Sequence, residues 1–77
     1  MEFSIARFFV LPSNGGEWLI FKEGLQRAIH RVPEKVNAVE TARAMARDYA
    51  PSEVIVERRD GSFFRQYAFA RGGAEAF

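Results

Sequence analysis

The sequence predicts an α+β fold in which one helix packs on one face of an antiparallel sheet of about five strands. Three observations favour this class. Residues 37–49 are the one segment whose apolar residues recur with a sustained helical period. Runs of β-branched and aromatic residues lie on both sides of that segment. Turn-forming residues separate these runs, so the expected order of elements is β-β-β-α-β-β.

Length and composition indicate a single small domain. Of the 77 residues, we assign 1–69 to this α+β domain and 70–77 to a flexible tail. The chain has no cysteine, which excludes disulfides and thiolate metal sites. A formal net charge of +1 argues against a strong overall attraction to nucleic acid or to an anionic membrane. No apolar run approaches the ~20 residues of a membrane span, and no signal peptide is evident, so we expect a cytoplasmic, bacterial protein.

The first two strands are expected to form a hairpin. Residues 3–11 (FSIARFFVL) are β-branched and aromatic and contain no Gly or Pro. Residues 12–16 (PSNGG) are turn-forming, and residues 17–22 (EWLIFK) resume the strand pattern. After a turn at Glu23-Gly24, residues 25–32 alternate loosely. We interpret them as a third strand, with a short helical turn as the alternative.

The helix is expected over Asn37–Tyr49. Asn37 and Glu40 have the spacing of a capping box, but a start at Pro33 or Glu34 is an alternative, because proline suits a first helical turn. Pro51 ends the helix. Arg43 and Arg47 fall on the polar face, which we expect to be solvated. The apolar stripe that faces the sheet consists of Ala38, Val39, Ala42, Met45, Ala46 and Tyr49.

Two further strands follow the helix. Residues 53–59 (EVIVERR) and 62–69 (SFFRQYAF) have strand composition. Asp60-Gly61 between them is a strong hairpin signal, and both residues of such a turn are expected to have positive φ.

The predicted sheet carries more apolar surface than one helix can cover. Five strands spaced ~4.8 Å apart span about 19 Å, whereas a helix is only ~10 Å across. The apolar residues on the opposite face therefore need another cover, such as the tail with Phe77, a second copy of the chain or a different partner. We favour a homodimer formed through this face. The alternative is that strong twist hides the surface within a monomer.

Several short motifs occur along the chain in a recognisable order. They are Val10-Leu11-Pro12, Gly16-Glu17-Trp18, Glu23-Gly24, Arg27-Ala28, Ala38-Val39, Ala42-Arg43 with Ala46, Val54–Val56 and Asp60-Gly61. In this order and spacing the sequence resembles the bacterial family called domain of unknown function 2188, over about residues 8–69. The resemblance implies a compact antiparallel sheet with one helix. It implies no activity, because that family has none assigned.

No pattern in the sequence indicates catalysis. His30 is the only histidine, and no carboxylate cluster at ligand spacing accompanies it, which favours a structural or surface role over a metal site or a general base. No hydroxyl lies in a nucleophile elbow, and no phosphate-binding loop or dinucleotide fingerprint is present. We therefore expect a protein that is not an enzyme, with no catalytic residue, cofactor, metal or small-molecule substrate.

The leading functional hypothesis is a small interaction module whose biochemical role the sequence does not identify. It would self-associate, or dock on a protein partner, through an aromatic face of the sheet. A small inhibitor or accessory protein would bind its partner through the same kind of sheet face. The residues expected on this surface are Phe8, Leu19, Phe21 and Phe64.

The alternative hypothesis is the binding of single-stranded RNA or DNA. Nine of the eleven cations are arginine, which grips phosphate and stacks on bases. Cations interleaved with aromatic residues on strands are typical of sheets that bind single strands. The candidate contacts are Arg7, Lys22, Arg27, Arg31 and Arg65.

Overall fold

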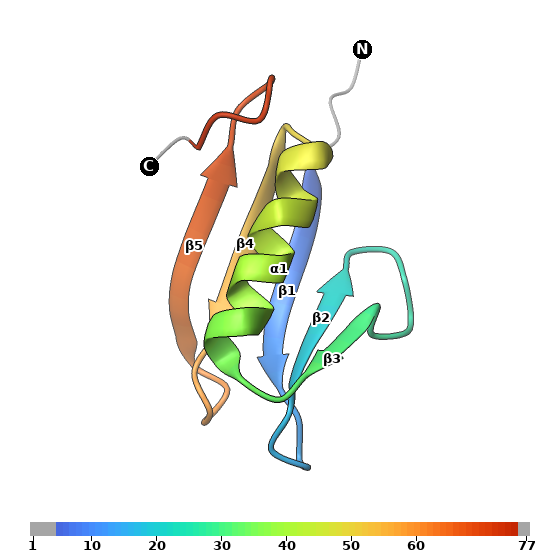
Figure 1. The fold of residues 1–77 in the computed structure, drawn as a ribbon, viewed down its shortest axis with the longest axis vertical. Coiled ribbons are helices and arrows are strands. Elements are labelled where there is room, and N and C mark those ends of the chain that lie inside the picture. The colour runs from blue at the N-terminus through green and yellow to red at the C-terminus, as the bar shows by residue number, and fades with distance from the viewer. Residues whose placement is uncertain (1–4, 76–77) are drawn as a thin grey trace.

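The computed structural model describes residues 5–75, which form one helix and a five-stranded sheet (Figure 1). The sheet order is β3-β2-β1-β4-β5. This confirms the α+β class and the expected order of elements along the chain. The elements are β1 (Ala6–Pro12), β2 (Trp18–Lys22), β3 (His30–Val32), α1 (Lys35–Asp48), β4 (Ser52–Glu57) and β5 (Phe63–Phe69).

The sheet is mixed, so the expectation of a wholly antiparallel sheet is wrong at one pair. Strands β1 and β4 run parallel, while β1–β2, β2–β3 and β4–β5 are antiparallel. The chain leaves β1 through the β2–β3 side and returns through α1 to the opposite side of β1. A helical crossover of this kind brings the chain back to the end where β1 began, which makes the new neighbour parallel.

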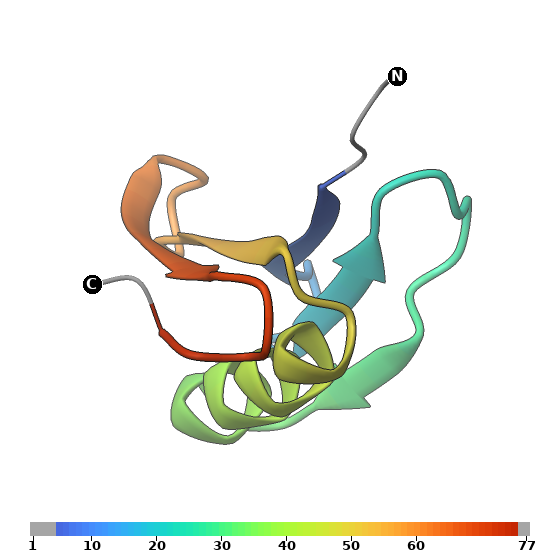
Figure 2. The ribbon, with the colours of Figure 1, turned by 90° about the horizontal axis from the view of Figure 1, so that it is seen from above.

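The helix covers one face of the curved sheet, and Figure 2 shows it beneath β1, β2 and β4. Burial alternates along the strands, as expected when only one face is sealed. In β4, Ser52, Val54 and Val56 are buried, while the residues between them are half-buried. The core between sheet and helix consists of Phe8, Val10, Trp18, Ile20, Ala38, Ala42, Ala46, Val54, Val56 and Phe69.

Three alanines allow α1 to approach the sheet closely. Ala38, Ala42 and Ala46 have no exposed surface, which confirms the predicted stripe at its centre. Tyr49 lies at its margin instead and is 52% exposed, with its ring 5.6 Å from that of Phe8. The small side chains allow the helix backbone to lie near the strands, so Phe8 fills the space that larger helix residues would occupy.

The helix begins earlier than the capping-box prediction placed it. It starts at Lys35, and Glu34 is its N-cap residue without a side-chain cap. Asn37 instead donates a hydrogen bond from Nδ2 to Oε1 of Glu34, at 3.4 Å. The capping box of Asn37 and Glu40 is therefore wrong, and the alternative start at Pro33 or Glu34 is close to the observed one. At the other end, buried Ser52 donates its hydroxyl to the carbonyl oxygen of Ala46.

The third strand is shorter than predicted. Only His30–Val32 pairs with β2, and residues 25–29 are irregular. Gly24 has φ of 95°, and Leu25 N–H donates to the Lys22 carbonyl in a turn that carries the chain away from β2. Pairing resumes where Ile29 N–H donates to the Ile20 carbonyl at 2.7 Å.

The hairpin between β4 and β5 is present, but its turn differs from the predicted type. Gly61 has φ of 89°, whereas no residue other than glycine among those described has positive φ, so Asp60 does not. Gly61 N–H donates to the Arg58 carbonyl, and Arg58 N–H donates to the Ser62 carbonyl. This is a three-residue loop in which only the glycine position is left-handed.

Residues 70–75, predicted as part of a flexible tail, turn back toward the helix. Ala70 N–H donates to the Ala74 carbonyl at 2.8 Å, and Glu75 forms an antiparallel bridge with Phe69. The tail thus adds one paired residue to the outer edge of β5. Phe77, considered above as a cover for the sheet, lies outside the described residues.

Candidate functional site

The four residues predicted for an interaction surface do not lie on one face. Leu19 and Phe21 lie on the face away from the helix, because they alternate with the buried Trp18 and Ile20. Phe8 is fully buried beneath the helix, so its expected place on an exposed surface is wrong. Phe64 is 45% exposed but lies on the helix side, where it contacts Lys35.

An apolar patch occupies the centre of the face away from α1. Phe9 is directly opposite Phe21, and Leu11 is opposite Leu19 in the β1–β2 register. Ile55 extends the patch, because it is the parallel partner of Phe9 in β4. We call these five residues, Phe9, Leu11, Leu19, Phe21 and Ile55, the open face.

Sequence analysis missed three members of the open face. Alternation within residues 3–11 places Phe8 and Phe9 on opposite faces, but it does not say which of the two faces the helix covers. Ile55 was not identified because its position beside Phe9 depends on the parallel pairing of β1 with β4. The number of residues between successive strands in the sequence does not determine that register.

Charged residues frame the open face and are paired within the chain. Arg7 donates from Nε to Glu53 at 2.6 Å and from Nη1 to Glu23 at 3.3 Å. The hydrogen bond to Glu53, followed by the nearby charge of Glu23, raises the pKa of the Arg7 guanidinium. At the opposite end, Arg31 pairs with Glu17 at 3.5 Å. Both signs of charge are therefore present at each end of the patch, and its centre carries none.

No helix or strand of residues 5–75 covers the open face. Figure 2 shows the single helix on the other side of the sheet. The five side chains are nevertheless half-buried, because they pack against each other and against their neighbours on a curved sheet. Curvature thus shields part of this surface, and the remainder is accessible to a partner.

The five cations predicted for nucleic-acid contacts are spread over the molecule. Arg7 and Arg31 lie at opposite ends of the open face. Lys22 lies over the Tyr49 ring on the helix side, 5.2 Å from its centroid. Arg27 is exposed in the connection between β2 and β3, and Arg65 is exposed on β5 at the far edge of the sheet. These residues do not form one basic surface.

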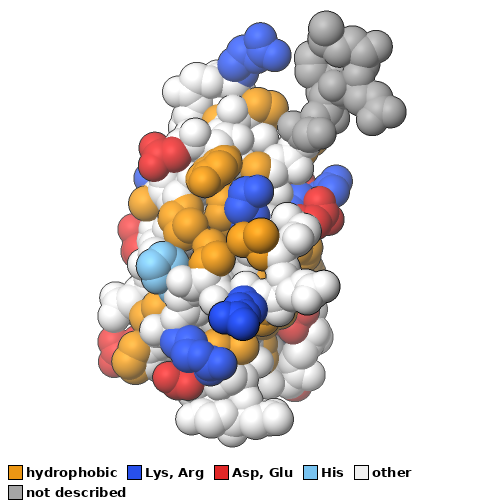
Figure 3. Space-filling model, turned by 90° about the vertical axis from the view of Figure 1, so that its right-hand side faces the viewer, with side chains coloured by type: hydrophobic (Ala, Val, Ile, Leu, Met, Phe, Trp, Pro, Cys, Tyr) orange, Lys and Arg blue, Asp and Glu red, His pale blue; other side chains and the backbone are white. Residues whose placement is uncertain are grey.

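A further apolar area lies on the edge formed by β2, β3 and their connection. Figure 3 shows hydrophobic side chains gathered on this side, with cations among them. Leu25 is 53% exposed there, and Ile29 packs against the core from the connection. Because β3 has only three residues, this edge offers little backbone for pairing with another chain.

A groove lies between α1 and β5, on the helix side of the sheet. Its volume is about 340 Å³. An extra residue in β5 shapes it, because Val56 is paired with Arg65 and Glu57 with Phe63, which leaves Phe64 as a bulge. The lining residues, which define the α1/β5 groove, are Lys35, Val36, Val39, Glu40, Phe64 and Tyr67.

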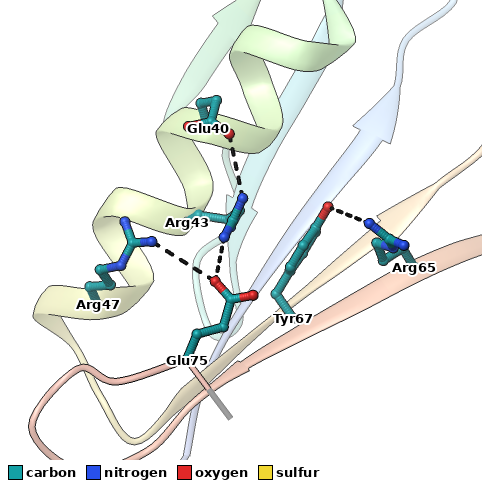
Figure 4. A network of polar contacts seen from close by, with 6 residues as sticks. All are labelled: Glu40, Arg43, Arg47, Arg65, Tyr67 and Glu75. Atoms are coloured by element: carbon teal, nitrogen blue, oxygen red, sulfur yellow. Dashed lines mark hydrogen bonds and ion pairs between the residues drawn. The ribbon is translucent and has the colours of Figure 1, made fainter. Parts of the chain in front are cut away.

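An ion-pair network lies next to this groove (Figure 4). Arg43 binds the carboxylate of Glu75 and lies 3.5 Å from Glu40, and Arg47 lies 3.9 Å from Glu75. The hydrogen bond to Glu75 raises the pKa of Arg43. The Arg43 side chain is only 23% exposed, so the predicted solvated position is wrong for this residue. The tail covers it, and its guanidinium carbon lies 4.6 Å from the centroid of the Tyr67 ring.

His30 is exposed on the edge strand β3. Within residues 5–75, no group of three or more His, Cys, Asp or Glu side chains has the geometry of a metal site. The helix that the structure describes is too short and too polar to cross a membrane.

The chain matches a known protein family over most of its length. A family model described as "Uncharacterized protein conserved in bacteria (DUF2188)" matches residues 8–69. No curated protein and no solved structure matches the chain. The matched segment runs from the middle of β1 to the end of β5 and includes every residue of the open face. The resemblance noted from the sequence motifs is thereby confirmed: the chain belongs to the bacterial DUF2188 family.

Proposed function

We propose that this protein is a small, non-catalytic interaction module that forms a homodimer through the open face. The observation that carries the proposal is an apolar patch on a sheet face that no helix of residues 5–75 covers. The patch consists of Phe9, Leu11, Leu19, Phe21 and Ile55. Contiguous apolar side chains on a sheet face are stabilised when a second layer removes them from water.

The charged frame supports a second copy as the occupant. Arg7 with Glu53 at one end and Arg31 with Glu17 at the other place both signs of charge at both ends. When two identical faces dock, opposite charges can therefore meet at both ends of the interface. A partner recognised mainly by charge would need one sign to dominate. A different protein with an apolar sheet face remains the competing occupant, as for an inhibitor or accessory protein.

Sedimentation velocity of the intact chain tests self-association. At concentrations of about 10 µM and above we expect a dimer, with a Kd of about 1 µM, which corresponds to a binding free energy of about −8 kcal/mol. Phe21→Glu places a carboxylate at the centre of the interface and should weaken dimerisation by at least about 100-fold. Phe64→Glu is the matched control, because it makes the same change on the opposite side of the sheet.

Circular dichroism would establish that both variants retain the fold. A strict monomer at all concentrations would overturn the homodimer. A dimer that survives Phe21→Glu but is lost in Phe64→Glu would place the interface on the wrong face.

The dispersed positions of Arg7, Lys22, Arg27, Arg31 and Arg65 do not favour nucleic-acid binding through these residues, so we do not propose it through them.

A further inference from the structure

Strand β5 is the outer strand of the sheet, and its outer side is largely unpaired. It is the last strand in the order β3-β2-β1-β4-β5. Among residues 5–75, the one residue that pairs with this outer side is Glu75, which bridges to Phe69. The Phe63 carbonyl accepts a hydrogen bond from Nη1 of Arg58 at 2.8 Å. The edge of β5 along residues 64–67 therefore presents the backbone groups that another extended chain can pair with.

The pairing of the chain's own tail shows how an added strand binds at this edge. Residue 75 pairs in antiparallel orientation beside Phe69, and its carboxylate reaches Arg43 and Arg47 on α1. Phe69 is a core residue on the helix side, and directly paired residues project to the same face. An added strand thus directs alternate side chains into the space between β5 and α1, where an acidic side chain finds arginine.

The remainder of this space also holds cations above aromatic rings, and Glu40 is the carboxylate that lines it. Lys35 Nζ lies 4.0 Å from the centroid of the Phe64 ring, and the Arg58 guanidinium carbon lies 5.6 Å from it. The Arg65 guanidinium carbon lies 5.6 Å from the centroid of the Tyr67 ring. Among the residues that the structure describes, these three cations form no ion pair, unlike Arg43 and Arg47.

The α1/β5 groove supplies an apolar slot between these cations. Its wall and floor are largely apolar, and Val36 and Phe64 are 66% and 45% exposed. A volume of about 340 Å³ accommodates one or two apolar side chains. Glu40 is the one carboxylate that lines it, and that carboxylate lies 3.5 Å from Arg43.

We propose that β5 and the α1/β5 groove bind an extended acidic peptide segment of a partner protein. The peptide pairs with the edge of β5 along residues 64–67. Its carboxylates bind Lys35, Arg58 and Arg65, and an apolar side chain between them enters the groove. This surface is separate from the open face, so it goes beyond the proposed homodimer, and either proposal can fail without the other.

The geometry favours a peptide over a single-stranded nucleic acid. Bases bind to sheets by stacking on free aromatic faces. In this groove the Tyr67 ring lies between Arg43 and Arg65 (Figure 4), and the Phe64 ring carries Lys35. The faces of these rings are in contact with cations, and the N–H groups of the cations can donate to oxygen ligands. Backbone pairing at an edge strand is a further contribution that only a polypeptide makes.

Fluorescence anisotropy on the intact chain tests this proposal with three probes. They are a labelled peptide of about ten alternating glutamate and valine residues, its lysine–valine counterpart, and a labelled oligothymidylate of the same length. We expect saturable binding of the acidic peptide alone, weakened by added salt because exposed charges are screened. Amide spectra of labelled protein should shift mainly in residues 64–67 and in the first half of α1.

A charge-reversed variant localises the site. Lys35→Glu combined with Arg65→Glu should weaken binding of the acidic peptide by at least about tenfold, since two of the three cations become repulsive. Arg27→Glu is the control on the other side of the molecule, and it should change affinity by less than about twofold. Amide spectra establish that each variant is folded.

Three results would overturn the proposal. They are no binding of the acidic peptide at low salt, equal loss of affinity in the Arg27→Glu control, and amide shifts confined to the open face. Preferential binding of oligothymidylate would replace the peptide with a nucleic acid as the ligand of this groove.

Discussion

The two faces of the sheet are built from similar side chains but end in different environments. Phe8 and Phe9 are neighbours in β1, yet Phe8 has no exposed surface and Phe9 is half-buried. Val54 and Ile55 in β4 repeat this contrast. The difference comes from the alanine-lined helix, which seals one face and is absent from the other. An apolar side chain is therefore suited to burial, but the position of α1 decides whether that side chain is buried.

The contrast has a functional consequence. The face sealed by α1 contributes to the stability of the monomer. The apolar side chains on the other face, which no helix of residues 5–75 covers, contribute when a second surface meets them. Substitutions on the two faces should therefore differ in their effect on the stability of the monomer.

Truncating the two adjacent phenylalanines should separate the faces most clearly. Phe8→Ala should lower the free energy of unfolding by about 3–5 kcal/mol, because it leaves a cavity under the helix. Phe9→Ala should cost about 1.5 kcal/mol or less in the dissociated monomer, since Phe9 is only half-buried. Urea unfolding at submicromolar concentration measures both. Equal costs would mean that the two faces do not differ in the monomer.

Enlarging helix residues tests how closely α1 approaches the sheet. Ala42→Leu should destabilise the fold by about 1–3 kcal/mol, because Ala42 has no exposed surface and the added atoms have no space. Ala44→Leu on the exposed side of the helix is the matched control and should change stability by less than about 0.5 kcal/mol. Thermal unfolding of the two variants checks the difference. A neutral Ala42→Leu would show that the helix does not lie close to the strands.

Removing the carboxylate of Glu75 tests the outer edge of β5, which is neither sealed by α1 nor part of the open face. Glu75→Gln should reduce global stability by less than about 1 kcal/mol, because its ion pairs with Arg43 and Arg47 are partly exposed. Hydrogen exchange at the Ala70 amide should accelerate, since this amide donates to the Ala74 carbonyl in the docked turn. Unchanged exchange at Ala70 would mean that Glu75 does not hold the tail.

The smallest effect concerns the β4–β5 turn. Ser62 donates from its hydroxyl to Asp60 at 2.6 Å and from its backbone N–H at 2.9 Å, and these bonds lower the pKa of the Asp60 carboxyl. A carboxyl with a lowered folded-state pKa stabilises the fold above the unfolded pKa of about 4 and loses this contribution as pH falls through the folded value. Ser62→Ala should therefore raise the pKa of Asp60 toward its ordinary value in an NMR titration. A pKa that does not rise would exclude the Ser62 hydroxyl as the main cause.

Local patterns predicted the elements but not all of their neighbours. The spacing of Ala38, Ala42 and Ala46 predicted the buried helix face, because helical periodicity is encoded within one segment. The parallel pairing of β1 with β4 depends on which side of the sheet the chain returns to after α1, and no single segment contains that information. The third strand was overextended for a related reason, since loose alternation alone did not reveal that Gly24 turns the chain away from β2.

Local sequence patterns also predicted the candidate surfaces only in part. Alternation separates Leu19 and Phe21 from Trp18 and Ile20, but only the burial of Trp18 and Ile20 in the structure shows which pair faces the helix. Phe8 was misplaced because alternation pairs it with Phe9 but does not orient the strand. The α1/β5 groove was not predicted, because it depends on the bulge at Phe64 and on the return of Glu75 to the helix.

The central claim is that the open face meets the open face of a second copy. Mixing labelled with unlabelled protein and recording isotope-filtered nuclear Overhauser effects detects contacts between copies directly. The account predicts intermolecular contacts among the side chains of Phe9, Leu19, Phe21 and Ile55. A monomer at the concentrations used for NMR, or intermolecular contacts confined to α1 and β5, would contradict it.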